Sequence, residues 1–167
     1  MKNRLGNIRK IKEREKPNDV FDTPLQVALK LINMAGIQQE DKVLDASRGD
    51  GVLFNNFPPC CLKEWCEIRE GRDFFEFFDP MDIIVSNPPF SIYTKWLQHC
   101  IKLNPRKIAL IMGCLNLTTI RLKLLEDNGY YLTKLHIVNI KGWFGITYLV
   151  LFEKGGLPIF SYDTFRH

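Results

Sequence analysis

Short apolar runs alternate with segments of helical periodicity along this 167-residue chain as far as residue 128, and two closely spaced apolar runs follow. Alternation of this kind favours a mostly parallel sheet flanked by helices. Two apolar runs joined by a short connection favour an antiparallel hairpin at one edge of that sheet. The pattern therefore predicts an α/β fold of the Rossmann-like kind.

The boundaries of the predicted elements follow from turn and capping signals. The first helix is predicted from Thr23-Pro24, with Thr as the N-cap and Pro in the first helical position. Leu25, Ala28, Leu29 and Ile32 are expected on its apolar face. The predicted strands cover residues 42–45, 64–68, 81–86, 107–112, 135–140 and 146–153, and the predicted helices cover residues 24–35, 51–57, 93–103 and 118–128.

Polar side chains stand at the ends of three predicted strands. Asp45 ends the first, Glu67 lies near the end of the second, and Asn87 follows the third. Ligands of open α/β sheets bind beyond the carboxyl ends of the strands. The three positions therefore locate a candidate ligand site.

The segment 45–51 (DASRGDG) has glycines directly after a strand, which let the backbone approach a ligand closely. It is also compatible with a plain strand-to-helix turn. It does not match the dinucleotide fingerprint, because Phe54 stands where the third glycine would be. Glu67 can accept hydrogen bonds from both hydroxyls of a ribose. The alternative for Glu67 is a strand-end carboxylate in solvent.

The segment 71–75 (GRDFF) follows at once. Asp73 is placed to accept a hydrogen bond from the exocyclic amine of an adenine, with Phe74 or Phe75 against the ring. The other interpretation of this aromatic run is hydrophobic core.

Asn87-Pro88-Pro89-Phe90 is the most specific signal in the chain. Two prolines at a strand end restrict the backbone so that a carbonyl and the Asn side-chain oxygen converge. Two acceptors then face one amino group, with an aromatic ring beside them.

These motifs, in this order and together with residues 21–24 (FDTP), resemble those of class I S-adenosylmethionine-dependent methyltransferases. Within that class the chain looks most like the adenine-N6 amino-methylases, in a compact phage and bacterial subgroup, and the resemblance covers about residues 20–153. The NPPF element is shared by adenine-N6 enzymes on DNA, by adenine-N6 and guanine-N2 enzymes on RNA, and, as NPPY, by glutamine-N5 enzymes on protein. It therefore indicates an amino-group acceptor without selecting the polymer.

The resemblance implies S-adenosyl-L-methionine as cofactor and a reaction that needs no metal. At the late hairpin, Trp143 and Phe144 are placed to form one wall of a substrate pocket, or to serve as packing residues. The resemblance implies cofactor contacts for Phe21, Thr23, Pro24, Asp45, Ser47, Gly49, Gly51, Glu67, Ile68, Asp73 and Phe74, and catalytic roles for Asn87, Pro88, Pro89 and Phe90.

Three departures from the family pattern concern this site. Arg48 stands where small residues are usual. Only Arg69 and Glu70 separate Ile68 from Gly71, so the helix that normally follows the ribose strand is missing. No segment is long enough for a separate target-recognition domain, which favours a protein partner that helps to read the target.

Charge is concentrated at the N-terminus, where residues 1–16 hold seven Lys and Arg against two Glu, although the net charge of the whole chain is only +4. We expect residues 1–18 to be a basic flexible arm, which either contacts nucleic acid or is simply solvated. Residues 19–167 are expected to form a single methyltransferase domain. The five cysteines form no CxxC pair, and no apolar run is long enough to span a membrane, so a cytoplasmic protein is expected.

The sequence therefore predicts a methyltransferase acting on an exocyclic amino group of a nucleic-acid base. Adenine N6 in DNA is favoured over RNA. The alternatives are an RNA base amino-methyltransferase, a protein glutamine-N5 methyltransferase, and a non-catalytic binding protein that keeps the fold.

Overall fold

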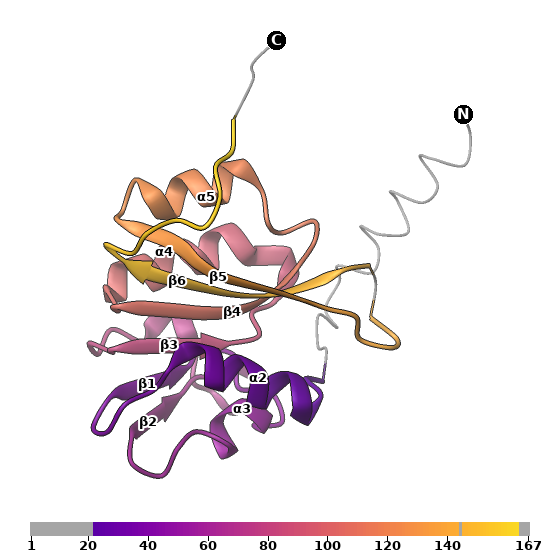
Figure 1. The fold of residues 1–167 in the computed structure, drawn as a ribbon. Coiled ribbons are helices and arrows are strands. Elements are labelled where there is room, and N and C mark those ends of the chain that lie inside the picture. Colours follow the sequence, from indigo (N-terminus) through magenta and orange to yellow (C-terminus); the bar gives the residue numbers. More distant parts are fainter. Residues whose placement is uncertain (1–21, 144, 164–167) are drawn as a thin grey trace.

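A computed structural model describes residues 22–143 and 145–163, which form a six-stranded sheet in the order β2-β1-β3-β4-β6-β5 (Figure 1). The first four strands in sequence pair in parallel, whereas β6 runs antiparallel to both β4 and β5. The predicted α/β fold with a C-terminal antiparallel hairpin is therefore confirmed. The strands are β1 (Lys42–Asp45), β2 (Leu62–Trp65), β3 (Ile83–Ser86), β4 (Lys107–Gly113), β5 (Tyr130–Val138) and β6 (Thr147–Lys154).

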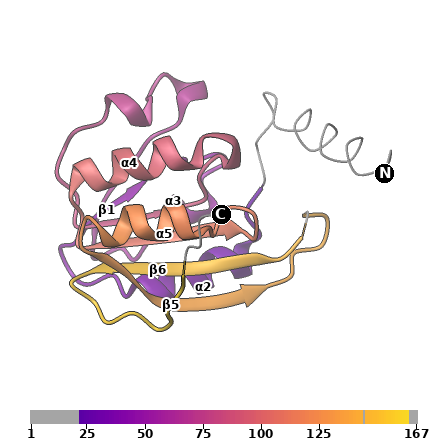
Figure 2. The same ribbon diagram turned by 90° about the horizontal axis from the view of Figure 1, so that it is seen from above.

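Helices cover both faces of the sheet (Figure 2). One face packs against α2 (Leu25–Ala35) and α3 (Val52–Asn55), and the other packs against α4 (Tyr93–Leu103) and α5 (Thr119–Glu126). Each face thus has its own apolar cluster, with the buried strands β3 and β4 contributing to both. This is the layering of a doubly wound sheet.

The first helix differs from the prediction at its start and in its buried face. Pro24, not Thr23, is the N-cap, and no side chain caps the helix. Ala28 and Ile32 are buried as predicted, whereas Leu25 and Leu29 are exposed, at 53% and 46%. The stripe that faces the sheet follows a 3.6-residue period from Ala28, and it holds Ala28, Leu31, Ile32, Met34 and Ala35.

The largest differences in strand boundaries are in the second and fifth strands. The second strand ends at Trp65, so Glu67 lies beyond it and Ile68 begins a short 3-10 helix, Ile68–Glu70. The fifth strand begins at Tyr130, five residues before the predicted start. A register shift between Leu132 and Lys134 breaks the alternation that sequence periodicity detects.

A second 3-10 helix, Phe74–Glu76, follows, so two short turns stand where the family pattern has a helix, and the sequence already indicated that this helix is missing. A third, Phe90–Ile92, leads into α4. Among the described residues, no helix is long and apolar enough to cross a membrane, and no group of three or more His, Cys, Asp or Glu is placed to hold a metal ion.

Candidate functional site

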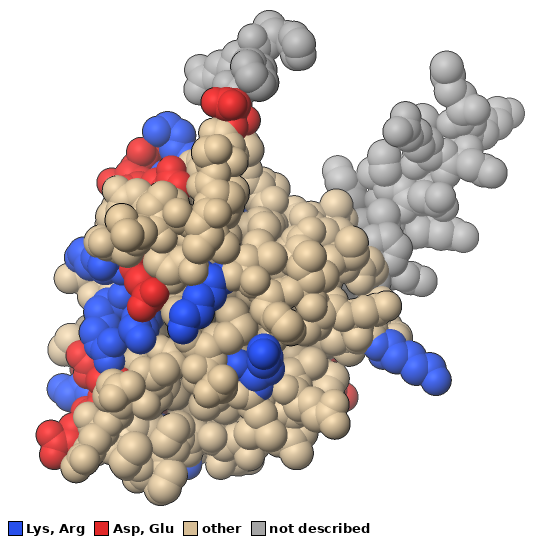
Figure 3. Space-filling view, viewed as in Figure 1, with Lys and Arg blue, Asp and Glu red and all other residues tan. Residues whose placement is uncertain are grey.

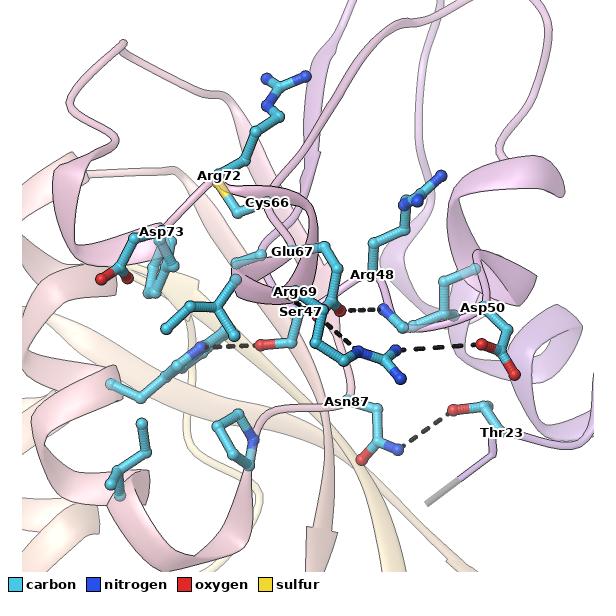
Figure 4. A pocket seen from close by; sticks show the side chains of 18 of the residues that line it. Thr23, Ser47, Arg48, Asp50, Cys66, Glu67, Arg69, Arg72, Asp73 and Asn87 are labelled. Carbon is cyan, nitrogen blue, oxygen red and sulfur yellow. Dashed lines mark hydrogen bonds and ion pairs between the residues drawn. The ribbon is translucent and has the colours of Figure 1, made fainter. Parts of the chain in front are cut away.

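A cavity of about 300 Å³ opens at the carboxyl ends of β1, β2 and β3. Its walls come from segments far apart in the sequence (Figure 4). The lining residues are Asp22 and Thr23, residues 46–50 with Val52 and Leu53, residues 66–69 and 72–75, and Asn87, Pro89, Ile92 and Trp96.

The turn after β1 forms the floor of this cavity. Gly49 has a φ of 55°, a left-handed conformation that side chains rarely adopt. The backbone amide of Gly51 closes the turn on the carbonyl of Arg48 at 2.9 Å, and the Ser47 hydroxyl accepts a hydrogen bond from the Trp96 indole at 3.1 Å. The turn is thus held both by its own backbone and by helix α4.

Asp45 lies beneath the turn and is fully buried. Its Oδ1 accepts hydrogen bonds from the Ser86 hydroxyl at 3.0 Å and from the Ser47 amide at 3.4 Å. Burial raises the pKa of Asp45 to about 7, because these hydrogen bonds only partly offset the loss of water. Asp45 therefore links the turn after β1 to the residue that precedes Asn87.

Glu67 stands at the cavity wall with its side chain almost buried. Its Oε2 accepts from the Gly49 amide at 2.8 Å, and its Oε1 accepts from the Arg69 amide at 3.1 Å and from Arg69 Nε at 2.9 Å. Burial alone raises the pKa of this carboxyl, but the hydrogen bonds from Arg69 and Gly49 outweigh burial and lower the pKa. Glu67 is therefore held as an anion.

The predicted adenine side of the site has both polar and apolar groups. Asp73 lines the cavity, and its Oδ1 accepts from the Phe75 amide at 2.9 Å. Phe74 lines the cavity and is also core, because it is 5% exposed and its ring centroid lies 4.9 Å from that of Trp96. Ile68 lines the same wall and is exposed. Phe74 is therefore core, as the second interpretation of the aromatic run expects, and its contact with an adenine stays a prediction.

Asn87 lies at the opposite side of the cavity from Asp73 (Figure 4). Its Nδ2 donates to the Thr23 hydroxyl at 3.2 Å, which orients the amide so that Oδ1 points away from Thr23. Pro89 lines the cavity, whereas Pro88 is buried behind it. The contact joins the N-terminal segment to the strand end that carries the NPPF element.

Phe90 and Trp143 meet beside this strand end, although 53 residues separate them in the sequence. Their ring centroids lie 6.3 Å apart with planes at 73°, an edge-to-face pair. The late hairpin therefore brings an aromatic ring to the predicted catalytic segment, and Trp143 also packs against the core cluster of α2 and α3. A contact of Trp143 with substrate stays a prediction.

The predicted residues fall into three groups. Thr23, Ser47, Gly49, Glu67, Ile68, Asp73, Phe74, Asn87 and Pro89 line the cavity, whereas Pro24, Asp45, Gly51, Pro88, Phe90 and Trp143 lie around or beneath it. Phe21, Phe144 and the arm of residues 1–18 lie outside the described residues.

Arg48 lines the cavity, and its side chain extends away from Asn87 (Figure 4). Its guanidinium lies 4.1 Å from the centroid of the Trp65 ring, and the guanidinium of Arg72 lies 4.2 Å from the same ring. Glu70 pairs with Arg48, and Glu64 pairs with Arg72 at 2.8 Å. We call these five residues the Trp65 stack.

Sequence reasoning did not find this stack, nor Arg69, Ile92 and Trp96 among the lining residues. The available signal was the density of charged residues on both sides of the WCE sequence. That signal does not tell which charges meet.

No protein-family model and no curated protein matches the chain. Solved structures do resemble it. TrmN from Thermus thermophilus is 20% identical, with a TM-score of 0.56 over 78% of this chain and 48% of its own. Magnesium protoporphyrin IX methyltransferase from Synechocystis PCC 6803, with bound SAM, is 13% identical, with a TM-score of 0.63 over 78% of this chain and 79% of its own.

The 23S rRNA methyltransferase ErmE is 15% identical, with a TM-score of 0.59 over 86% of this chain and 73% of its own. At these identities the likeness shows the fold, which is the Rossmann-like fold of class I S-adenosylmethionine-dependent methyltransferases. The chain spans about half the length of TrmN.

Proposed function

We propose that this protein binds S-adenosyl-L-methionine in the 300 Å³ cavity and methylates an exocyclic amino group of a nucleic-acid base, adenine N6 in DNA being favoured. One observation carries the proposal: Gly49, Glu67 and Asn87, which follow three neighbouring strands, converge on one cavity in a methyltransferase fold. The solved structure of the Synechocystis protein holds SAM in the same fold.

The residues present fit this cofactor. Gly49 has no side chain to fill the cavity floor, and the Glu67 carboxylate faces the cavity from the adjoining wall. Phe74, Trp96 and Ile68 supply apolar surface for a purine, and Asp73 supplies an acceptor for its amine. When bound, the cofactor supplies an electrophilic methyl group on a sulfonium.

The role of the NPPF segment is to prepare the acceptor amine. The lone pair of an adenine amino group is delocalised into the ring, so the nitrogen is a poor nucleophile. The amine donates one hydrogen bond to Asn87 Oδ1 and one to the Pro88 carbonyl. These two hydrogen bonds favour a pyramidal nitrogen with a localised lone pair. Orientation and local electrostatics then supply the catalysis, while Phe90 and Trp143 contact the base.

The polymer is the open part of the proposal. RNA is the second candidate, because the chain resembles the rRNA methyltransferase ErmE, and a base in a single-stranded loop does not have to be flipped out of a duplex. A glutamine side chain of a protein presents the same kind of amino group. The last alternative is a binding protein that keeps the methyltransferase fold and does not catalyse transfer.

The first test is calorimetric titration with S-adenosyl-L-methionine, followed by transfer of a tritiated methyl group to DNA, RNA and protein. We expect saturable micromolar binding and labelled N6-methyladenine after digestion of DNA. Labelled RNA nucleosides or N5-methylglutamine would instead support the alternatives. Absence of binding would contradict the cofactor assignment.

Asn87→Ala should abolish transfer while the dissociation constant of the cofactor stays within about threefold, since the variant gives up one neutral hydrogen bond to Thr23. Asn128→Ala is the matched control, because the Asn128 side chain is exposed just beyond α5 and, among the described residues, hydrogen-bonds only the Leu124 carbonyl. Loss of cofactor binding in Asn87→Ala would contradict the assigned role.

A further inference from the structure

Arg69 lies across the cavity between its two acidic neighbours. Its Nε donates to Glu67 Oε1 at 2.9 Å, and its Nη2 lies 4.0 Å from Asp50 Oδ1. A Cβ placed on Gly49 would lie 4.0 Å from the same Nη2. Figure 4 shows the side chain running from Glu67 toward Asp50. The guanidinium therefore stands over the position that the glycine leaves open.

The hydrogen bonds that Glu67 already accepts limit the acceptor sites that it can offer to a ligand. An ionised carboxylate has about four lone-pair sites. Three are in use here: one by the Gly49 amide, one by the Arg69 amide and one by Arg69 Nε. A ribose that presents two hydroxyls needs two acceptors. The second becomes available only when Arg69 Nε leaves.

Arg69 is free to leave without disturbing the carboxylate. Its side chain is 51% exposed, and ion pairs in contact with water are weak. The two backbone amides that hold Glu67 stay in place when the guanidinium moves away. The side chain thus blocks one acceptor reversibly, whereas the position of Glu67 is set by the backbone.

We propose that Arg69 competes with the ribose of the cofactor for Glu67, and that it thereby sets the cofactor affinity of this site. This inference rests on the proposed function, since it requires a ribose at Glu67. It predicts that removal of the guanidinium strengthens binding, whereas removal of an ordinary contact residue weakens it.

The test uses calorimetric titration with S-adenosylhomocysteine, whose neutral sulfur avoids a direct charge effect of Arg69 on a sulfonium. Arg69→Met, which removes the guanidinium but keeps an extended side chain, should bind about three- to tenfold more tightly than the wild type. Arg106→Met is the matched control, because Arg106 also pairs with a carboxylate, that of Asp41 at 2.6 Å, and precedes β4 at the opposite end of the sheet. It should bind like the wild type.

A second ligand tests whether Arg69 competes with the two ribose hydroxyls for Glu67. The 2′-deoxy analogue of S-adenosylhomocysteine presents one hydroxyl and needs one acceptor, so Arg69→Met should gain less than about twofold for it. Arg69→Gln repeats the comparison with a polar side chain, and thermal unfolding confirms that each variant is folded.

Unchanged or weaker binding of S-adenosylhomocysteine by Arg69→Met and Arg69→Gln would overturn the inference while leaving the cofactor site intact. An equal gain with the 2′-deoxy analogue would also overturn it, since the competition would then not concern the diol. Failure of every protein, wild type included, to bind the ligand would remove the proposed function together with this inference.

Discussion

At the scale of single residues, Asp45 carries an electrostatic cost that depends on pH. Its pKa is raised from 3.8 to about 7 in the folded protein, because the carboxyl is fully buried. Between these values the folded state holds a proton that the unfolded state releases. The contribution of Asp45 to stability is therefore present below about pH 4 and is lost as the pH rises toward 7.

Asp45→Asn should remove this part of the pH dependence. We expect the free energy of unfolding of the variant to fall less than that of the wild type between pH 4 and 7, and to exceed it at pH 8, because no buried charge forms. Chemical denaturation at several pH values measures this difference. If Asp45→Asn kept the pH profile of the wild type, Asp45 would not be the source of this pH dependence.

The affinity of the wild type for the cofactor should rise as the pH passes 7, since an ionised Asp45 attracts a cationic sulfonium.

At the scale of elements, the Trp65 stack holds the segment after β2 in place, where the family pattern has a helix. The 3-10 helix Ile68–Glu70 is too short to pack as a helix would, yet it carries one wall of the cavity. Arg48 connects this wall to the cavity floor, through Glu70 on one side and the ring of Trp65 on the other. Arg48 is thus a positioning residue for the segment that bears Glu67.

Arg48→Ala should loosen this wall. We expect the free energy of unfolding to fall by about 1–2 kcal/mol, the scale of one cation–π contact and one partly exposed ion pair. Hydrogen exchange at the Gly71 amide, which bonds the Ile68 carbonyl at 3.1 Å, should accelerate. Arg48→Lys keeps the charge but loses the planar contact with Trp65, so only partial rescue is expected. Unchanged exchange in Arg48→Ala would show that the wall stands without the stack.

At the scale of the whole molecule, the basic charge lies in the N-terminal arm and the body is near neutral. On the face shown in Figure 3, basic and acidic side chains mix along one side, further basic side chains stand nearer the centre, and the rest of the surface is uncharged. If nucleic acid is the partner, as proposed, its phosphates meet the arm sequence as their main source of positive charge.

Deletion of residues 1–16 should therefore weaken nucleic-acid binding and reduce its salt dependence. The slope of log affinity against log salt concentration should fall in magnitude by about 0.7–0.9 for each phosphate that the shortened chain no longer neutralises. Fluorescence anisotropy with a labelled oligonucleotide at several salt concentrations measures the slope. A full-length chain with its seven arm lysines and arginines replaced by glutamine separates charge from length. An unchanged slope in both would assign the arm no role in binding.

The local pattern of the sequence was enough for the buried centre of the fold. Strand β1 and helix α4 have the predicted bounds, and β4 extends one residue beyond its prediction. These elements have apolar residues in unbroken or periodic runs, because each buries a full face. The order of motifs along them likewise indicated which loops would form the site, before any contact was known.

Tertiary structure decided what local pattern does not encode. The bounds of β2 were missed because this edge strand is mostly exposed and lacks an apolar run. The contact of Phe90 with Trp143 depends on the pairing of β6 with β4. The stacking of Arg48 and Arg72 on Trp65 depends on the reversal of the chain between Trp65 and Arg72. Charged and aromatic side chains are compatible with many partners, so only the folded chain selects the contact each one makes.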